Sequence, residues 1–449
     1  MSSGRPWQGR RLHFIGVGGA GMSGLALVAR ALGAEVSGSD RVASSYTERL
    51  RATGIHPAIG HDASNLPDGA EVVVSTAIPR DNPELAKARD AGLRILHRGD
   101  LLSEEMALKR SVAVAGAHGK TTTSAMLAHV LRETGRDPAF VIGGELRAAR
   151  TNAAWGEGEW IVVEADESDR SFLKLSPDVA VVTNIELDHH TTYGSEAELI
   201  AAFAEFAAKA GERIVWERAP LDVDALRFGI GEGEFAAADV ELAPGGSRFD
   251  IAVPRVEERH PVTLAVPGRH NVLNALAALA AAERAGVPFE ESAPAIASFS
   301  GTGRRFEARG TTSSGALVFD DYAHHPTEVR ATLEAARTLD GERLVAVFQP
   351  HLYSRTQHLA KQFGEALALA DAVVVVGIYP ARERAEDFPG VSGHQVAAAA
   401  ARAGRGRPVY WLPSMDDAAA MLERDLHEGD VLLTLGAGNI DSLAGRLAS

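Results

Sequence analysis

The sequence predicts an α/β protein built from three domains, and three observations lead to this prediction. The chain has 449 residues, which corresponds to about three domains of ordinary size, and its 45% hydrophobic content is enough for packed cores. Short apolar segments alternate with stretches of helical periodicity, as in βαβ units. Two glycine-rich loops each follow a predicted strand and precede a predicted helix. We therefore expect a Rossmann-like N-terminal domain, a central domain with a β-rich insert and a doubly wound C-terminal domain.

The N-terminal domain is predicted to span residues 1–108, because a polar, charged passage at 98–110 precedes the next apolar strand. Its predicted elements are strands at 12–16, 35–37 and 71–75 and a helix at 22–32.

The central domain is predicted to span residues 109–310. A glycine-rich stretch at 229–246 is typical of β-hairpins and predicts the β-rich insert. The other predicted elements are strands at 160–164, 179–184 and 214–216 and a long helix at 271–285.

The C-terminal domain is predicted to span residues 311–449, where strands and helices alternate regularly. We expect strands at 316–320, 343–348, 372–378, 409–412 and 431–435, with helices at 327–338 and 355–369 between the first three.

Composition excludes several classes of function. A net charge of -15 argues against nucleic acid or an anionic membrane as partner, since either requires a basic surface. Cysteine is absent, which excludes disulfides, thiolate nucleophiles and cysteine-ligated zinc. No apolar stretch is long enough to insert into a membrane, and the N-terminus continues into a strand instead of a cleavage site, so we expect a cytoplasmic protein.

The first glycine-rich loop has the sequence Gly-Val-Gly-Gly-Ala-Gly at residues 16–21. It matches the dinucleotide pattern G-x-G-x-x-G between a strand and a helix, and Asp40 follows at the end of the next strand. These glycines allow a diphosphate to approach a helix N-terminus, so the ligand is equally well NAD or a UDP-sugar. A tight turn without a ligand is the remaining alternative.

The second loop, residues 116–123, ends in Gly119, Lys120 and Thr121 between a strand and a helix. Backbone N–H groups of such a loop face phosphates, the lysine supplies a positive charge, and the threonine hydroxyl meets a phosphate-bound Mg²⁺. Val114 occupies the place of the first glycine in the full Walker pattern, so this loop is shorter. It predicts a P-loop-type ATPase domain.

Acidic residues follow two further strands of the central domain. Residues 164–169 contain four acids, and residues 186–190 contain Glu186, Asp188 and two histidines. Strand ends are where α/β sheets display functional groups, and hard oxygen ligands with one imidazole suit Mg²⁺ or Mn²⁺ better than zinc. For a single acid a solvated loop is the plain alternative, but for Glu164 and His189 we predict a functional role.

Two more groups of polar residues are candidates. Asn271 and Asn274 lie three apart at the start of a predicted helix, where they either contact an adenine or serve as a helix cap. Arg305 lies near a domain boundary and can clamp a transferring phosphate.

In the C-terminal domain, polar residues gather at two strand ends that we expect to be adjacent. Asp321 can accept a hydrogen bond from a ribose hydroxyl, and a small carboxylate can be bound by Tyr322, His324, His351 and Arg355.

These residues resemble the Mur ligases of bacterial cell-wall synthesis along nearly the whole chain. The resemblance is carried by residues 13–22, Gly38-Ser39-Asp40, the loop with His118 before Gly119-Lys120, and the segments 164–169, 320–326, 348–351 and 436–439. It implies domains for UDP-N-acetylmuramate, ATP and an amino acid, in that order. The implied reaction joins L-alanine to the muramyl carboxylate through an acyl phosphate, with ATP and Mg²⁺ as cofactors.

The resemblance also implies the site residues. Lys120, His189, Arg305 and His324 are the implied catalytic residues, and Thr121, Glu164 and His189 the metal ligands. The ATP-binding residues are Gly116, Ala117, His118, Gly119, Lys120, Thr121, Thr122, Asn271, Asn274, Arg305 and Asp321. The UDP-sugar-binding residues are Gly16, Gly18, Gly19, Ala20, Gly21, Met22, Ser39 and Asp40, and the amino-acid-binding residues are Tyr322, His324, His351 and Arg355.

Two departures and three alternatives accompany this resemblance. Several relatives use a carbamylated lysine after the Asp-His strand, whereas residues 201–210 contain only Lys209, out of the expected register. Leu352 stands where the family commonly has arginine, so one basic contact near the amino acid is absent. A ligase that attaches a whole tripeptide shares the loop with His118. An NAD-dependent dehydrogenase explains the first domain but not Lys120 and Thr121, and an ATP-binding regulator leaves the C-terminal crevice unused. We expect a monomer or a homodimer.

Overall fold

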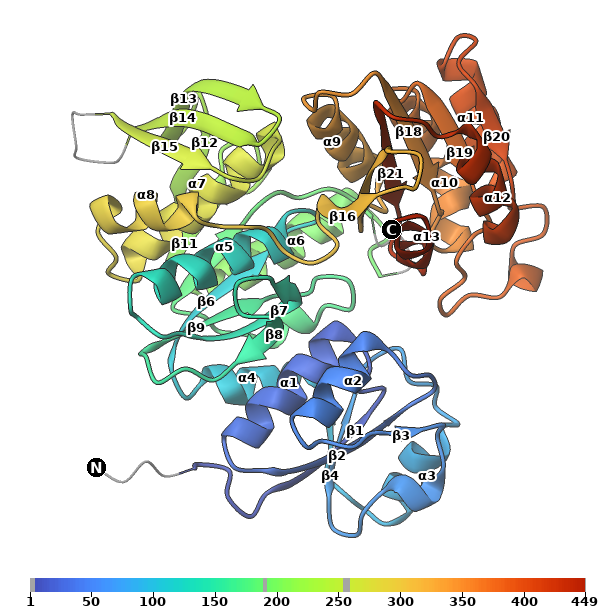
Figure 1. Ribbon diagram of the computed structural model, residues 1–449. Coiled ribbons are helices and arrows are strands. Elements are labelled where there is room, and N and C mark those ends of the chain that lie inside the picture. The colour runs from blue at the N-terminus through green and yellow to red at the C-terminus, as the bar shows by residue number, and fades with distance from the viewer. Residues whose placement is uncertain (1–4, 189–191, 253–258, 449) are drawn as a thin grey trace. The chain divides into compact units, whose positions relative to one another are not determined.

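The computed structural model describes residues 5–188, 192–252 and 259–448, which contain three mainly parallel sheets (Figure 1). The predicted three-domain α/β fold is confirmed. By compactness the chain forms two units: Met1–Ala238, Ile251–His260 and Leu273–Phe299 make up the first, and Asp239–Asp250, Pro261–Val272 and Ser300–Ser449 the second. The first sheet and most of the second lie in the first unit, and the third sheet lies in the second unit; residues 239–250 and 261–264 of the second sheet are assigned to the second unit. No helix of the described ranges is long and apolar enough to span a bilayer.

The first sheet is fully parallel, with the strand order β3-β2-β1-β4-β5. The side chains of β1 alternate: Leu12 and Phe14 join the core beneath α1, while Ile15 packs with Leu85 of α3 on the opposite face. The elements are β1 (Arg11–Ile15), α1 (Ala20–Ala31), β2 (Glu35–Asp40), α2 (Ser45–Ala52), β3 (Ala58–Ile59), η1 (Ala63–Asn65), β4 (Glu71–Val74), α3 (Pro83–Asp90) and β5 (Ile95–His97).

The second sheet has β6 at its centre, flanked by β9 and β10. Parallel pairing brings the carboxyl ends of these three strands to one edge. The elements of the first unit here are α4 (Arg98–Met106), β6 (Arg110–Ala115), α5 (Lys120–Glu133), β7 (Ala139–Leu146), β8 (Thr151–Ala154), β9 (Trp160–Glu164), η2 (Ser171–Lys174), β10 (Val179–Val182), α6 (Glu196–Ala208), β11 (Glu212–Trp216), β12 (Leu226–Ile230) and α8 (Phe289–Ala297).

The β-rich insert differs from the expected hairpins at its first connection. Strands β12 and β13 pair in parallel, with Phe228 opposite Phe235, because the glycine-containing link between them turns the chain back to the start of the ladder. The sheet order then continues through β14 and β15. The elements are β13 (Phe235–Ala243), β14 (Gly246–Ala252), β15 (His260–Leu264) and α7 (Arg269–Arg284).

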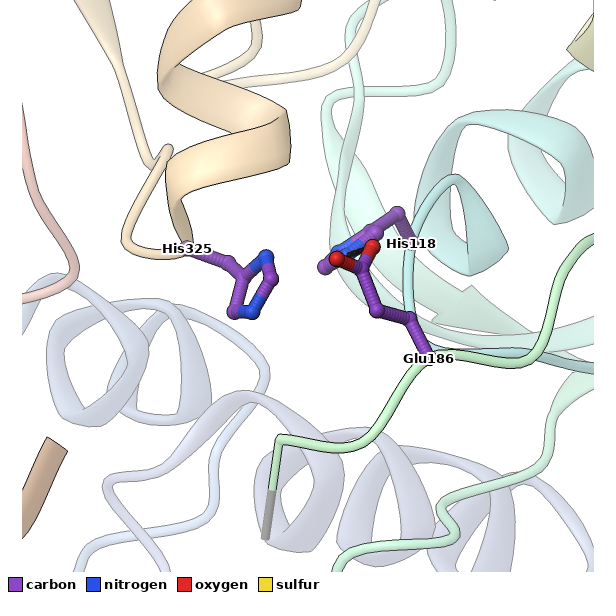
Figure 2. A group of neighbouring side chains, drawn as sticks. All are labelled: His118, Glu186 and His325. Carbon is purple, nitrogen blue, oxygen red and sulfur yellow. Dashed lines mark hydrogen bonds and ion pairs between the residues drawn. The ribbon is translucent and has the colours of Figure 1, made fainter. Parts of the chain in front are cut away.

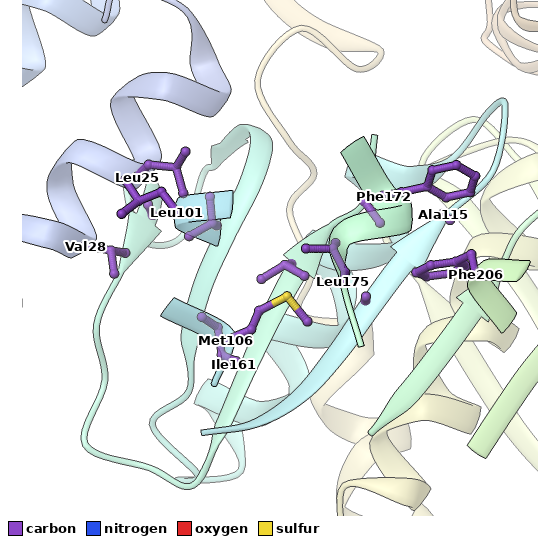
Figure 3. Packing of buried hydrophobic residues seen from close by; sticks show 14 of the residues in the cluster. Leu25, Val28, Leu101, Met106, Ala115, Ile161, Phe172, Leu175 and Phe206 are labelled. Carbon is purple, nitrogen blue, oxygen red and sulfur yellow. The ribbon is translucent and has the colours of Figure 1, made fainter. Parts of the chain in front are cut away.

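Helix α4 joins the first two sheets through one hydrophobic core. The passage 98–110, polar in sequence, forms this helix and buries Leu101 and Met106 (Figure 3). On the other side of the same core, the ring of Phe172 lies 5.2 Å from the ring centroids of both Phe203 and Phe206. The continuous core fixes the ends of β1 and β6 within one compact unit.

The third sheet is doubly wound, with buried hydrophobic clusters on both faces. Its order is β16-β17-β21-β18-β19-β20, and only the edge strand β16 is antiparallel. The last strand, β21, therefore separates β17 from β18, which we expected to be adjacent. The elements are β16 (Glu307–Thr311), β17 (Leu317–Asp321), α9 (Pro326–Ala336), β18 (Arg343–Phe348), α10 (Tyr353–Leu367), β19 (Ala372–Val375), η3 (Ala385–Asp387), α11 (His394–Ala403), β20 (Val409–Trp411), α12 (Met415–Asp425), β21 (Asp430–Leu435) and α13 (Asp441–Leu447).

A buried polar cluster lies beneath the first sheet's strand ends. The Glu84 carboxylate accepts hydrogen bonds from His13 Nε2 and Ser39 Oγ, both at 2.7 Å, and from Asn65 Nδ2 at 3.1 Å. Glu84, His13 and Ser39 have no exposed surface. Burial by itself raises the pKa of Glu84, but these donors outweigh burial and lower the pKa to about 2.

The lowered pKa predicts acid sensitivity. Between about pH 4.5, the ordinary pKa of a glutamate, and pH 2, the unfolded chain binds a proton at Glu84 that the folded chain does not. Stability is therefore present above pH 4.5 and is lost as pH falls through this window, by about 3 kcal/mol from this group. Urea unfolding at a series of pH values should show a shallower acid slope for Glu84→Gln. The same slope as wild type would contradict the prediction; exposed Glu35→Gln is the control.

Candidate active site

The first glycine-rich loop leaves β1 through a conformation that requires glycine. Gly16 has φ +81°, and the N–H groups of Gly16 and Val17 donate to the Ser39 carbonyl at 2.8 and 3.0 Å. The Gly18 N–H donates to Asp40 Oδ2 at 2.7 Å, and a Cβ on Gly18 would lie 2.8 Å from that oxygen. The end of β2 thus shapes the loop, and the loop opens onto the N-terminus of α1.

The predicted residues of this loop divide into two groups. Met22 is 5% exposed and packs in the core, and the Ser39 hydroxyl is bound to Glu84, so both support the loop from below. Gly19 is the N-cap of α1 and has open space around it, and the Ala20 carbonyl accepts from Asn152 Nδ2 at 2.7 Å. Sequence analysis missed Asn152, which reaches α1 from β8.

The second glycine-rich loop follows β6 and is clamped by the segment after β10. The His118 N–H donates to Asn184 Oδ1 at 2.9 Å, while Thr183 Oγ1 and Asn184 Nδ2 donate to the His118 carbonyl at 2.6 and 2.8 Å. Gly116 and Gly119 have positive φ angles of 142° and 82°. A methyl group on Gly116 would collide with Thr183, which explains the need for glycine there.

The side chains around this loop are also held in place. His118 Nε2 lies 2.9 Å from Glu186 Oε2 (Figure 2), and this contact fixes the position of the imidazole ring. A methyl group on Gly119 would collide with Asn274 Oδ1, and that oxygen accepts from Thr123 Oγ1 at 3.3 Å. The predicted contact of Asn274 with the loop region is therefore present. Ala117 donates to the Asn184 carbonyl, and Thr122 is 8% exposed.

Lys120 is enclosed beneath the loop. Its Nζ donates to the Gly116 carbonyl at 2.6 Å and lies 3.0 Å from Glu167 Oε2. Burial alone lowers the pKa of a lysine, but the carboxylates of Glu167 and Glu164 outweigh burial and raise the pKa of Lys120. The ammonium is charged throughout the physiological range, and it lies against the carbonyl groups that line the loop.

The four acids at the end of β9 divide among three partners. Glu164 Oε2 accepts from Thr121 Oγ1 at 2.8 Å and from the Gly143 N–H at 2.7 Å. Glu167 pairs with Lys120. Asp166 and Asp169 both bind the Arg98 guanidinium, at 2.7 and 2.8 Å. The sequence did not indicate which acid of this group binds a metal. In the structure, Glu164 is the acid that contacts the loop residue Thr121.

The Thr121–Glu164 pair fits a divalent cation of the Mg²⁺ type. A hydroxyl and a carboxylate oxygen are hard donors, and the glycine at 143 leaves room for the carboxylate, since a Cβ there would lie 2.6 Å from Glu164 Oε2. His189, the other predicted ligand, lies outside the described residues. Asp188, just before it, is 8% exposed.

A cavity of about 130 Å³ within the first unit begins at Gly21, the last residue of the first loop, and ends at Glu164, which accepts a hydrogen bond from Thr121 of the second loop. Arg98 and Asp166 lie on its polar side. The apolar side is formed by Leu25, Leu102, Val141, Ile142, Phe172 and Leu175. The arrangement can hold a group that is part apolar and part anionic, between a diphosphate at one end and a metal-bound phosphate at the other.

In the second unit, the predicted amino-acid residues come together. The ring centroids of Tyr322 and His324 are 5.3 Å apart, and those of His324 and His351 are 6.0 Å apart. Arg355 NH1 donates to His351 Nδ1 at 3.1 Å. Tyr379, which sequence analysis missed, stacks on His351 at 5.8 Å. Its only sequence signal is its place just after an apolar strand.

Leu352 has a strained backbone in this crevice. Its φ is +70°, a region that disfavours a branched side chain, and the residue is 7% exposed. Its N–H donates to the Tyr379 carbonyl at 3.0 Å, and its carbonyl accepts from Thr356 Oγ1 at 2.8 Å. These bonds hold the turn that sets His351 and Arg355 on the same side.

The remaining predicted residues are held by their own loops. Asp321 accepts from the N–H groups of Phe306 and Ala323, both at 2.7 Å, and burial raises the pKa of its carboxyl to about 6. The Arg305 guanidinium lies 5.1 Å from the centre of the Tyr322 ring and 3.7 Å from Glu328. Asn271 Nδ2 donates to the Pro267 carbonyl at 2.7 Å. Glu328, in the first turn of α9, was not among the predicted residues.

Comparison with known families covers most of the chain. Residues 11–110 match the Mur ligase family, catalytic domain; residues 114–282 match the Mur ligase middle domain; and residues 304–438 match the Mur ligase, glutamate ligase domain.

Individual relatives agree with these matches. The chain is 46% identical to a UDP-N-acetylmuramate--L-alanine ligase of Acidithiobacillus ferrooxidans over 97% of this chain and 96% of the relative. It is 45% identical to the enzyme of the same name from Streptomyces coelicolor over 100% and 99% of the two chains. The crystal structure of UDP-N-acetylmuramate-alanine ligase from Thermotoga maritima superposes with a TM-score of 0.86 at 30% identity, covering 97% of this chain and 98% of that one. This chain belongs to the Mur ligase family.

Proposed function

We propose that this protein joins L-alanine to the carboxylate of UDP-N-acetylmuramate, with conversion of ATP to ADP and phosphate. The observation that carries the proposal is the Gly116–Thr122 loop, where a charged lysine and a threonine–carboxylate pair lie at adjacent strand ends. Full-length relatives with 44–46% identity bear the name of this activity. A precursor of peptidoglycan is the product of this reaction.

The loop at 116–122 receives the phosphates of ATP. Its glycines allow the backbone N–H groups to approach phosphate oxygens, and the start of α5 adds its partial positive charge. The Lys120 ammonium exchanges the Gly116 carbonyl for a phosphate oxygen, because a phosphate is the better acceptor for a charged donor. Arg305 contributes a second positive charge toward the γ-phosphate. Asn271, Asn274 and Asp321 are proposed to contact the nucleoside.

Thr121 and Glu164 are the proposed ligands of Mg²⁺, with His189 as a ligand of a second ion. An Mg²⁺ ion held by these oxygens would supply positive charge beside the phosphates of ATP. The muramyl carboxylate attacks the γ-phosphoryl group to form an acyl phosphate, and the amine of L-alanine then attacks the acyl carbon and displaces phosphate. Related enzymes share this ATP-binding fold, and a Mur ligase from Thermotoga maritima with 17% identity has been crystallised with ADP.

The first loop binds the diphosphate of the UDP-sugar, through Gly16, Gly18, Gly19, Ala20 and Gly21 with Asp40 at the rim. A UDP-sugar explains why the chain carries a dinucleotide-type loop beside a phosphate-transfer site, whereas NAD leaves Lys120 without a role. The cavity between Gly21 and Glu164 then receives the part of the sugar that carries the carboxylate. Tyr322, His324, His351 and Arg355 bind the amino acid, with Arg355 on its carboxylate.

A tripeptide ligase remains the alternative within the family. A murein peptide ligase from Psychrobacter arcticus has the same fold, with a TM-score of 0.73, but its identity to this chain is 26%. Phosphate release from ATP and Mg²⁺ should be measured with UDP-N-acetylmuramate, adding L-alanine, glycine, L-serine or the tripeptide in turn. We expect the fastest turnover with L-alanine. Turnover with the tripeptide and none with L-alanine would overturn the proposal.

Removal of the loop lysine should separate the two ligand sites. Lys120→Ala removes the charge that stabilises the transferring phosphoryl group, so we expect turnover to fall by about 10³-fold or more. UDP-N-acetylmuramate should still bind, because its diphosphate site lies on another sheet of the unit. Calorimetric titration with the UDP-sugar checks this, and loss of binding in the variant would contradict the assignment of the two loops.

Substitutions in the acid cluster should distinguish a metal ligand from a structural acid. Glu164→Gln weakens the cation site, so the Mg²⁺ concentration for half-maximal activity should rise about tenfold or more. Asp166→Asn weakens the bonds to Arg98 and to the Ser168 N–H but leaves Thr121 and Glu164 unchanged, so this concentration should stay within about twofold while thermal stability falls. Magnesium titration of both variants is the measurement, and equal shifts would show that the acids share one role.

A further inference from the structure

The neighbours of His324 select one tautomer of its neutral ring. Its Nδ1 lies 3.1 Å from the Tyr322 carbonyl oxygen and 3.2 Å from Glu328 Oε2. A carbonyl and a carboxylate can only accept hydrogen bonds, so Nδ1 must carry the proton. In the neutral imidazole the lone pair is then on Nε2, which makes Nε2 the basic atom.

Glu328 cannot move away from this ring without losing other bonds. Its Oε2 also accepts from the N–H groups of His324 and His325, at 3.0 and 3.2 Å, where it completes the capping box of α9. Its Oε1 faces the Arg305 guanidinium at 3.7 Å, and the side chain is 12% exposed. A fixed carboxylate on Nδ1 orients the ring and stabilises the imidazolium once Nε2 has taken a proton.

The His324 ring lies among the predicted amino-acid-binding residues and is partly exposed. The His324 side chain is 20% exposed, and within residues 5–188, 192–252 and 259–448 no group forms a hydrogen bond with Nε2. The ring is flanked edge to face by Tyr322 and His351, and His351 in turn binds Arg355. A base and a carboxylate-binding arginine therefore share one crevice, which matches the two ends of a free amino acid.

We propose that His324 Nε2 removes the proton from the ammonium group of the incoming amino acid, with Glu328 as the residue that positions the ring. This inference rests on the proposed ligase activity. One N–H proton passes to Nε2 and then to water, which frees the nitrogen lone pair. The lone pair forms the C–N bond at the acyl carbon, the C–O bond to phosphate breaks, and the second proton leaves with hydrogen phosphate.

The charged and titratable groups that bear on this ring come from four elements. They are Glu328 of α9, Tyr322 and Asp321 at the end of β17, Arg304 and Arg305 before β16, and His351 with Arg355 at the start of α10. Of these groups, Glu328 contacts the ring at Nδ1 with its carboxylate, while Arg304 and Arg305 lie over the neighbouring Tyr322 ring.

Two nucleophiles test the proposal. L-alanine arrives as an ammonium and needs a base, whereas hydroxylamine is largely unprotonated at neutral pH and traps an acyl phosphate without one. At saturating amine and pH 7, we expect kcat for L-alanine to fall about tenfold in Glu328→Gln and about 10²-fold in His324→Asn. Hydroxamate formation by the same variants should fall by less than about threefold. Equal losses with both nucleophiles would overturn the proposal.

The pH profile separates a base from a binding group. The unprotonated fraction of L-alanine rises about tenfold per pH unit below its amine pKa, so the defect of both variants in kcat should shrink between pH 7 and pH 9. A raised KM for L-alanine with unchanged kcat would assign His324 to binding and overturn the proposal. Failure of the wild-type protein to ligate L-alanine, with hydroxamate still formed, would instead overturn the proposed amino-acid substrate.

Helix α4 provides a matched control for the capping role of Glu328. There too a histidine, His97, is the N-cap, and Asp100 at the third helical position accepts from the His97 N–H at 3.0 Å. Asp100→Asn makes the same change of charge in the same motif, outside the crevice. It should lower the melting temperature like Glu328→Gln but leave kcat for L-alanine unchanged. A similar kcat defect in Asp100→Asn would show that a weakened cap explains the loss.

Discussion

The buried ammonium group of Lys120 is the constraint on which the central site depends. A positive charge enclosed by protein is costly unless carboxylates lie beside it, and here Glu167 and Glu164 lie at the next strand end. The other two acids of the cluster, Asp166 and Asp169, pair with the guanidinium of Arg98. Because β10, β6 and β9 are neighbours in the sheet, the segment after β10, the loop after β6 and the acids at the end of β9 lie close together.

The negative net charge of the protein makes its few local cations important for binding anionic substrates. With a net charge of -15, the surface repels the anionic substrates of the proposed reaction, so attraction must come from a few cations and from backbone N–H groups. Both glycine-rich loops supply such groups at helix N-termini. Arg98, Lys120, Arg305 and Arg355 supply the charges, and each is already paired or oriented by a neighbouring side chain.

The sequence predicted what is encoded locally. Each loop is recognised because strand, glycines and helix follow one another within about twenty residues, and the strand-end clusters were found by the same rule. Partners that are distant in sequence were missed: Arg98 and Asp169 are 71 positions apart, and Tyr379 contacts His351 from the segment after the neighbouring strand β19. Strand β21 enters between β17 and β18 because parallel pairing is decided by the whole sheet, which no local pattern reports. His189 lies outside the described residues, so its role as a ligand stays a prediction.

The central claim is that the phosphoryl group held at Lys120 passes to a substrate carboxylate and not to water. Isotope transfer tests this most directly: UDP-N-acetylmuramate with ¹⁸O in both carboxylate oxygens is turned over with ATP, Mg²⁺ and L-alanine, and the released phosphate is analysed by mass. An acyl phosphate predicts one ¹⁸O atom in each phosphate, because the C–O bond breaks when the amine attacks. Phosphate without label, with its new oxygen taken from water, would contradict the claim.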